Sequence, residues 1–236
     1  MSTYCFSDLH GHIKLYNKIK EIVKPEDVVY CLGDCGDRGP DSWATIKAVL
    51  TDPQFIYIKG NHEDMLVKAA REALSMDCYS SCHRQRLLYS NGGETTITEL
   101  MKEKNPRLWI NQIDNLPLYK FYTNKSGKNI LLCHAGCSIW KGEEFFVPEG
   151  EEEEFIWDRV HYYDSSYLLD STIVVHGHTP ILYLAADIDV EEPDEWIALE
   201  YCDGKKFCID QGTYFSGHST LFNLDTFESI DINLKD

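Results

Sequence analysis

The chain has 236 residues, 43% of which are hydrophobic, and a formal net charge of −17. A chain of this length can bury one sizeable core, and we expect a single domain over residues 1–236. The negative charge argues against binding to nucleic acid or to an anionic membrane surface, because both are themselves negatively charged. It does not exclude an anionic substrate, since salt screens distant surface charges beyond roughly 10 Å and leaves a local cationic site effective.

Neither a membrane span nor a secretion signal is expected. The sequence has no apolar run long enough to cross a bilayer. The N-terminal residues MSTYCFSDLHGH lack a basic segment followed by an apolar one. Nine cysteines are an odd number for a secreted disulfide framework, so we expect free thiols and a cytoplasmic location.

The first part of the chain alternates between strand and helix patterns. Short apolar runs predict strands at 3–7, 27–32 and 55–59. This alternation favours a largely parallel α/β arrangement. Apolar residues at helical spacing predict the helices, at 11–24, 41–51, 65–74 and 94–102.

The rest of the chain is dominated by strand patterns. These suggest hairpins and a second sheet packed on the first, so that the expected fold class is α/β with two sheets. The predicted strands are at 116–122, 129–133, 172–175, 181–185, 197–201, 206–210, 219–223 and 229–232.

Short polar clusters stand at or near the ends of several predicted strands. Ligands of open α/β sheets bind beyond the carboxyl ends of the strands, so clusters that arrive there can converge on one site. Their carboxylate, imidazole and amide groups are ligands for divalent metals. Each cluster alone is a weak signal, and the order of the whole set carries the hypothesis. The clusters are Asp8-Leu9-His10, GDCGDRG at 33–39, GNHE at 60–63, His134-Ala135-Gly136 and Gly177-His178-Thr179.

The segments SDLHGH, GDCGDRG, GNHE, CHAG and HGHTP resemble the motif series of the calcineurin-like metallophosphoesterases. GDCGDRG and GNHE are similar to the marks of the phosphoprotein phosphatase branch, and in particular of its small bacterial and phage members. The resemblance covers nearly the whole chain, although the family tends to have DTG where this chain has Asp210-Gln211-Gly212. It implies a single metallophosphoesterase domain, built as a two-sheet β-sandwich flanked by helices, with a dinuclear metal site at the strand ends.

The resemblance also implies two divalent metal ions. Manganese is favoured, and iron or zinc would also suit carboxylate, amide and imidazole ligands. A carboxylate fits the bridging position between two ions about 3.5–4 Å apart. By motif position, Asp8 and His10 hold the first ion, Asp34 bridges both, and Asn61, His134 and His178 hold the second.

The expected nucleophile is a metal-bridged hydroxide, because bound metal strongly lowers the pKa of water. It would attack phosphorus in line, without a covalent phosphoenzyme. The resemblance gives His62 the task of protonating the leaving oxygen and Asp37 the task of orienting His62. Arg38, and Arg159 of FIWDRV, match the residues that bind phosphate oxygens. Glu63 is interpreted as a group that fixes the backbone.

The leading hypothesis is a metal-dependent phosphoric ester hydrolase that acts on phosphomonoesters, as a serine/threonine protein phosphatase. The alternative is a symmetrical dinucleoside tetraphosphate hydrolase, which would need surfaces for adenine stacking, with residues 65–104 as the candidate wall. A non-catalytic scaffold is less favoured because the ligand set is complete. The expected partner is a phosphorylated protein or a small phosphoester, and a nuclease is disfavoured by the charge.

Three features stay open at this level. His176 would face the same side of a strand as His178, but only His178 is assigned to the metal. The acidic run at 149–154 is interpreted as a solvated loop, and the alternative is that it favours basic phosphopeptides, because it leads into Arg159. Cysteines recur four residues apart and are interpreted as packing residues, at 31 and 35, 78 and 82, and 133 and 137.

Overall fold

The computed structural model describes residues 1–75, 83–137, 153–163 and 172–235, and its strands form two five-stranded sheets. In the first sheet β1, β2 and β3 run parallel, and β9 and β10 extend the other edge of β1 in antiparallel fashion. The order is β10-β9-β1-β2-β3, with β1 at Thr3–Phe6, β2 at Val28–Cys31, β3 at Phe55–Tyr57, β9 at His218–Asn223 and β10 at Ser229–Asn233.

The second sheet has a parallel centre and antiparallel edges. Its strands β5, β6 and β8 run parallel, while β4 pairs antiparallel with β5 and β7 with β8. The order is β4-β5-β6-β8-β7, with β4 at Tyr119–Thr123, β5 at Asn129–Cys133, β6 at Thr172–His176, β7 at Leu199–Tyr201 and β8 at Lys206–Cys208.

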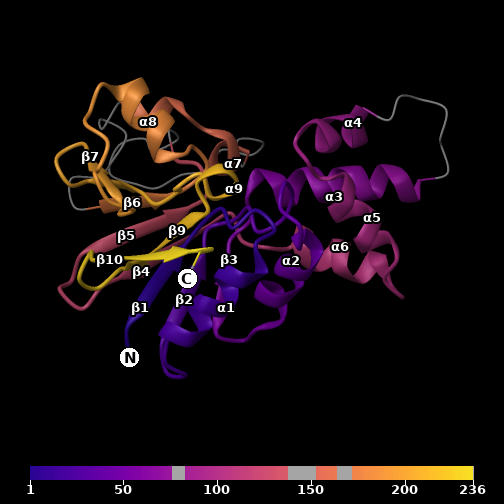
Figure 1. The fold of residues 1–236 in the computed structure, drawn as a ribbon, viewed down its shortest axis with the longest axis horizontal. Coiled ribbons are helices and arrows are strands. Elements are labelled where there is room, and N and C mark those ends of the chain that lie inside the picture. The colour runs from indigo at the N-terminus through magenta and orange to yellow at the C-terminus, as the bar shows by residue number, and fades with distance from the viewer. Residues whose placement is uncertain (76–82, 138–152, 164–171, 236) are drawn as a thin grey trace.

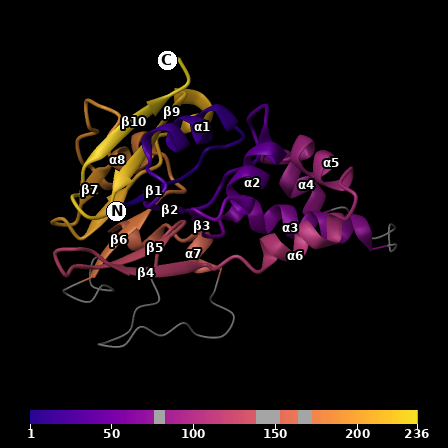
Figure 2. The same ribbon diagram turned by 90° about the horizontal axis from the view of Figure 1, so that it is seen from below.

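The two sheets pack face to face, as Figures 1 and 2 show. Because side chains alternate along a strand, every second residue of each sheet points into the space between them. This confirms the two-sheet sandwich expected from the resemblance. The shared apolar cluster includes Cys5, Tyr30 and Phe222 from the first sheet and Ile130, Leu132, Val175 and Phe207 from the second.

Helices cover the outer face of the first sheet. Their apolar sides join Phe6, Val29 and Phe55 of the strands in one buried cluster. In Figures 1 and 2, α3 to α6 gather at one end of the molecule, beside the sandwich. The helices are α1 at Ile13–Ile22, α2 at Ser42–Thr51, α3 at Asn61–Leu74, α4 at His83–Ser90, α5 at Glu94–Met101 and α6 at Pro106–Asp114.

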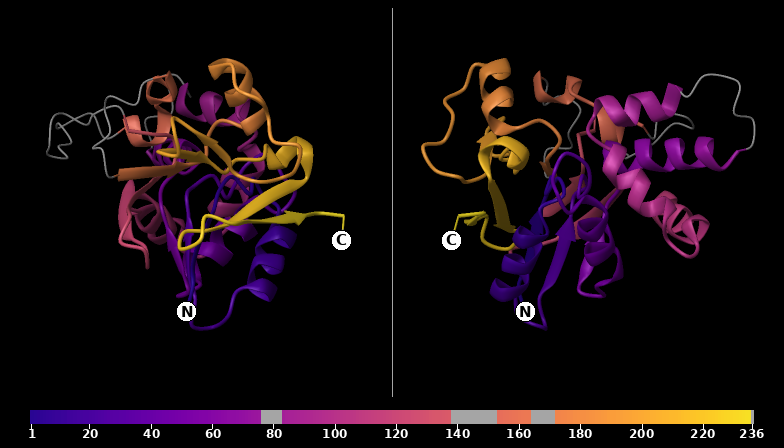
Figure 3. Two further views of the ribbon diagram at one scale, coloured as in Figure 1. Left: turned by 90° about the vertical axis from the view of Figure 1, so that its left-hand side faces the viewer. Right: turned by 45° about the vertical axis from the view of Figure 1, so that its right-hand side comes forward.

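Shorter helices cover the second sheet. Helix α7 (Glu154–Trp157) packs Phe155 on β5, and α8 (Ile181–Ile188) packs Leu184 on β7 and β8. A 3₁₀ turn at Val160–Tyr163 and the short α9 (Thr213–Ser216) complete the chain. Figure 3 shows α8 over the second sheet, on the side away from α1 and α2.

The strand prediction at 181–185 is wrong, because this segment is the first part of α8. A short continuous apolar run does not distinguish a buried strand from a buried helix. Pro180 starts the helix, and Asp189 ends it with a left-handed φ of 57°. Helices α4 and α6 were also not predicted, although Asn105 caps α6 by accepting a hydrogen bond from the amide of Leu108.

The described cysteines are all free thiols. Sγ atoms of Cys31 and Cys35 lie 3.1 Å apart in the interior, and Cys133 and Cys137 pack in the apolar cluster under α7. These two pairs therefore act in packing, whereas cysteines 78 and 82 lie outside the described residues. Within the described ranges, no helix is both long and apolar enough to span a bilayer.

The sandwich core makes a stability prediction. Leu132 is completely buried between the sheets, and Leu132→Ala should lower the free energy of unfolding by about 2–5 kcal/mol, since it leaves a cavity that the rigid sheets cannot close. The measurement is urea unfolding of metal-free protein. Leu108→Ala, at a position 52% exposed, is the control and should change stability little. Equal effects of the two changes would contradict the assignment of this core.

Candidate active site

The polar clusters converge at one edge of the sandwich, where the carboxyl ends of strands from both sheets meet. Asp8 and His10 follow β1, and Asp34 follows β2. The other ligand candidates follow β3, β5 and β6. These are Asn61, His134 and His178. All six ligand candidates predicted from the sequence are less than one-tenth exposed.

Side-chain atoms of Asp34, Asn61 and His134 lie close together in the interior. Nδ1 of His134 donates to the carbonyl of Leu32 at 2.7 Å, which leaves Nε2 directed at Oδ1 of Asn61, 2.8 Å away. Oδ2 of Asp34 lies 3.4 Å from the same Nε2. Burial alone would lower the pKa of His134, but the surrounding carboxylates, first that of Asp34, raise the pKa to about 10. A positive charge, whether a proton or a metal ion, is therefore favoured at this point.

His178 completes this first group. Its Nδ1 lies 3.1 Å from Oδ1 of Asn61 and 3.2 Å from Nε2 of His134. Its Nε2 is buried and has no hydrogen-bond partner among the described residues. Ligand atoms of Asp34, His134 and His178 all lie within 4.8 Å of one another, which is the spacing of a metal site.

A second group shares Asp34. It combines Asp34 with His10 and His62, whose ligand atoms also lie within 4.8 Å of one another. Asp8 is beside it, with Oδ1 3.8 Å from Nε2 of His10. Oδ2 of Asp8 accepts hydrogen bonds from the hydroxyl of Ser7 and the amide of His178, while Oδ1 is buried without a partner in the described part of the chain.

These two groups overlap the metal pair that the resemblance implies, but the second group contains His62, which the resemblance assigns to proton donation, and Asp8 lies beside this group. Asp34 belongs to both groups, as a bridging carboxylate would. The unpartnered atoms of Asp8 and His178 are oxygen and nitrogen donors of the kind that divalent metals accept. Burial raises the pKa of Asp8 to about 6, as expected for a buried carboxylate that is short of positive partners.

The loops that carry these groups are tightly folded. Several of the site residues have a left-handed backbone conformation, which residues other than glycine rarely adopt. At Gly60 a Cβ atom would lie 2.2 Å from Oδ1 of Asp34, so the loops after β2 and β3 approach each other only because glycine is present. The residues with positive φ are Asp8, His10, Asp34, Asp37, Arg38 and His178.

Glu63 fastens these two loops together. One carboxylate oxygen accepts hydrogen bonds from the amides of Asp34 and Gly60, at 2.8 and 2.9 Å. The other accepts from the amide of Cys35 at 3.1 Å and the hydroxyl of Tyr57 at 2.7 Å. Glu63 therefore has the backbone-fixing place that the sequence suggested.

His62 and Asp37 form a buried pair. Nδ1 of His62 lies 2.7 Å from Oδ2 of Asp37, and the hydroxyl of Thr96 donates to Oδ1 of the same carboxylate. Burial would lower the pKa of His62, but Asp34 and Asp37 raise it above its ordinary value. Thr96 is completely buried and was not singled out from the sequence, since a threonine on a predicted helix carries no distinguishing signal.

Arg38 lies over the second group. Its guanidinium donates to Nε2 of His10 at 2.8 Å and to Nε2 of His62 at 3.0 Å. The ring of Tyr214 stacks on it, 4.6 Å from ring centre to guanidinium carbon. Tyr214, from α9, is a further neighbour of the site that the sequence did not indicate.

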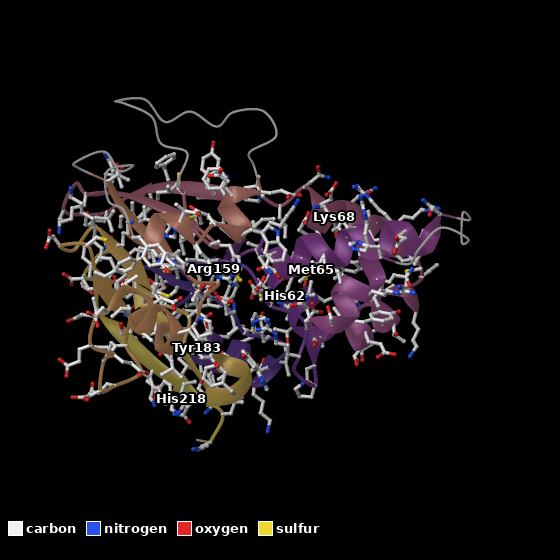
Figure 4. All side chains as sticks on the ribbon, turned by 90° about the horizontal axis from the view of Figure 1, so that it is seen from above. His62, Met65, Lys68, Arg159, Tyr183 and His218 are labelled. Atoms are coloured by element: carbon white, nitrogen blue, oxygen red, sulfur yellow. The ribbon has the colours of Figure 1, made fainter. Side chains whose placement is uncertain are left out.

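Arg159 lies between α7 and the 3₁₀ turn at Val160–Tyr163. Its Nε donates to the hydroxyl oxygen of Thr179, which directly follows His178 and also accepts from the hydroxyl of Tyr162. Figure 4 shows Arg159 and His62 in the region where the sandwich meets the helical end of the molecule. The structure thus supports placing Arg159 beside the same site as Arg38.

His176 does not join the site. Its Nε2 lies 2.7 Å from the hydroxyl of Tyr201, and its ring stacks on Tyr162 at 5.3 Å. The expectation that it faces the same side as His178 is wrong. The strand ends at His176, and His178 lies in a left-handed turn with φ of 70°, which breaks the two-residue alternation.

Both the sequence and the fold of this chain are similar to those of known proteins. The family model for calcineurin-like phosphoesterases matches residues 1–222. A bis(5′-nucleosyl)-tetraphosphatase PrpE [asymmetrical] of Oceanobacillus iheyensis is 30% identical over 64% of this chain and 62% of its own length. The enzyme with the same name from Anoxybacillus flavithermus is 25% identical over 85% of this chain and 77% of its own. The chain thus spans less than two thirds of the first relative.

A solved structure is similar in fold. A protein serine/threonine phosphatase of Saccharomyces cerevisiae has a TM-score of 0.62 and 13% identity, over 100% of this chain and 81% of its own. At that identity the likeness shows the architecture alone. The family match, the sandwich and the clustered metal-ligand candidates agree. The chain belongs to the calcineurin-like phosphoesterases.

Proposed function

We propose that the chain is a dinuclear metal-dependent phosphoesterase. The observation that carries this is the shared position of Asp34 between two groups of buried ligand atoms. When bound, the two cations would supply Lewis acidity and an activated water for in-line attack at phosphorus. The residues that would hold them are Asp8 and His10 on one side, Asp34 between, and Asn61, His134 and His178 on the other.

The two arginines would bind the phosphate. Arg38 lies in the loop after β2 and Arg159 lies between α7 and the 3₁₀ turn, so their guanidiniums can hold different oxygens of one phosphoryl group. In the present geometry Arg38 donates to the rings of His10 and His62. An anionic phosphate is a stronger acceptor than a neutral imidazole, so a bound substrate would draw Arg38 away from both rings.

Once Arg38 has left it, Nε2 of His62 would take up a proton from solvent, which the raised pKa of His62 favours, and would pass that proton to the leaving oxygen. Its Nδ1 is fixed by Asp37, and Nε2 becomes available once Arg38 has turned to the phosphate. Asp37 keeps the ring oriented and favours its charged form, while Thr96 holds Asp37. Thr96 is thus a positioning residue in this proposal.

The first substrate candidate is a phosphoserine or phosphothreonine in a protein. It is supported by the GDCGDRG and GNHE segments, which resemble the marks of the phosphoprotein phosphatase branch. Manganese is the favoured metal on the same grounds, and the cytoplasm is the proposed location. The ligand types alone also accept iron or zinc.

The second candidate is a dinucleoside tetraphosphate. It is supported by the names of the two bacterial relatives and by exposed rings beside the site, Tyr214 and Trp157. Cleavage of a phosphoanhydride could use the same residues. The sequence pointed to the symmetrical reaction. The two relatives above have asymmetrical in their names, whereas a relative from Acidovorax sp., 24% identical over 67% of this chain, has symmetrical in its name, so the products decide between the two reactions.

Metal content tests the ligand set. Wild-type protein dialysed against manganese should retain about two ions per chain. His134→Ala should retain fewer, because it removes a donor that is completely buried between Asn61 and Asp34. The measurement is elemental analysis by mass spectrometry after desalting. His218→Ala, at a histidine paired with Asp231 and outside both groups, is the control. Equal metal in both variants would refute the assignment.

The leaving group tests His62. His62→Asn should lower kcat with alkyl phosphates by about 100-fold and with p-nitrophenyl phosphate by much less, because nitrophenolate leaves without a proton. Steady-state kinetics with both substrates measure the ratio. The matched control is His218→Asn. An equal loss on both substrates would remove the proton-donor role.

A direct comparison tests the substrate. Manganese-loaded protein is given a phosphothreonine peptide or diadenosine tetraphosphate, and the products are separated by chromatography. Faster release of phosphate from the peptide would support the first candidate. Faster cleavage of the dinucleotide would support the second, and formation of ADP alone or of ATP with AMP would define the cleavage as symmetrical or asymmetrical.

A further inference from the structure

An open pocket of about 460 Å³ adjoins the proposed phosphate position. Arg159 belongs to both, so a substrate whose phosphate is held by Arg159 places its neighbouring groups at this pocket. The other lining residues have no part in the chemistry proposed above. The pocket is lined by Glu153, Glu154, Trp157, Asp158, Arg159 and Val160.

Trp157 is the principal surface of the pocket. Its ring meets that of His178 edge to face, with centroids 6.1 Å apart, while 37% of the residue is exposed. Val160 is 61% exposed beside it. An exposed indole with an aliphatic neighbour offers an apolar body and a negative ring face, which suit the long stem and positive head of a basic side chain.

The charge of the pocket points to a cation. Glu153 and Glu154 supply its acidic surface and Arg159 its basic one, while the third acid, Asp158, is 7% exposed and accepts from the amide of Val160. The rim already holds an ammonium group, because Nζ of Lys68 lies 2.5 Å from a carboxylate oxygen of Glu153. The net charge of −17 adds a long-range attraction for basic partners.

We propose that this pocket binds the side chain of a lysine or arginine next to the phosphorylated residue of a protein substrate. The proposal rests on the phosphatase function above and narrows its substrate class to basic phosphopeptides. A nucleobase could stack on Trp157 as well. However, a dinucleoside tetraphosphate would bring further negative charge toward Glu154, where like charges repel, since Glu153 is the glutamate that Lys68 already pairs.

The test compares three phosphothreonine peptides that differ only in the flanking residues, which are arginine, alanine or glutamate. With manganese-loaded wild type, kcat/KM should be about tenfold higher for the arginine peptide than for the alanine peptide. Trp157→Ala should reduce this ratio to near one, and Trp157→Phe should restore most of it, because phenylalanine keeps a ring face. A ratio taken within one variant is insensitive to a general loss of activity.

Glu154→Gln tests the charge without changing the shape of the pocket. It should lower the preference for arginine over glutamate peptides, and added salt should lower the preference of the wild type. Trp196→Ala is the matched control, since Trp196 is similarly exposed at 38% but stacks on His218, outside the pocket. It should leave the preference unchanged.

Each outcome separates this proposal from the one it rests on. No release of phosphate from p-nitrophenyl phosphate by wild type would refute the phosphoesterase function itself. Normal turnover with no preference among the peptides, or with a preference that survives Trp157→Ala, would overturn the pocket assignment alone. If Trp157→Ala instead raises KM for diadenosine tetraphosphate only, the pocket holds a nucleobase and the proposal is wrong.

Discussion

The buried negative charge of Asp34 is the constraint around which the rest of the site is arranged. Its carboxylate lies 3.4 Å from Nε2 of His134 and 3.8 Å from Nε2 of His62, and the residue is 2% exposed. A carboxylate removed from water is costly unless positive groups surround it. Burial would raise the pKa of Asp34, yet the rings of His134 and His62 hold it well below its usual range. His134 follows β5 of the second sheet, and His62 follows β3 of the first. The site therefore requires that the carboxyl ends of strands from both sheets meet.

The geometry that achieves this is strained. Left-handed residues other than glycine cost about 1–3 kcal/mol each, and they are concentrated in the loops beyond β1, β2 and β6. The sandwich core has to offset that cost, and the carboxylate of Glu63 holds two of the loops in place through their backbone amides. Stability and chemistry are thus divided between the interior of the sandwich and its edge.

Much of this arrangement could be predicted from the sequence, because order along the chain was informative. Polar motifs after apolar strands identified the groups that the structure brings together, and the alternation of strands and helices identified the first sheet. The predictions that were wrong or missing concern features that depend on contacts between distant segments. The apolar run at 181–185 has the pattern of a strand but forms the first part of α8. His176 faces away from the site because the turn after it breaks the alternation of side chains along the strand. Thr96, Trp157 and Tyr214 are defined only by what they touch in space.

The start of α3 shows how two neighbouring residues can have different tasks. Asn61 and His62 occupy the first turn of the helix, where successive side chains point about 100° apart. Oδ1 of Asn61 therefore faces His134 while the ring of His62 faces Asp37. Inserting or deleting one residue before Glu63 would rotate both side chains away from their partners at once. A change in the length of this segment therefore removes both contacts at once, whereas a substitution at Asn61 or His62 removes one of them.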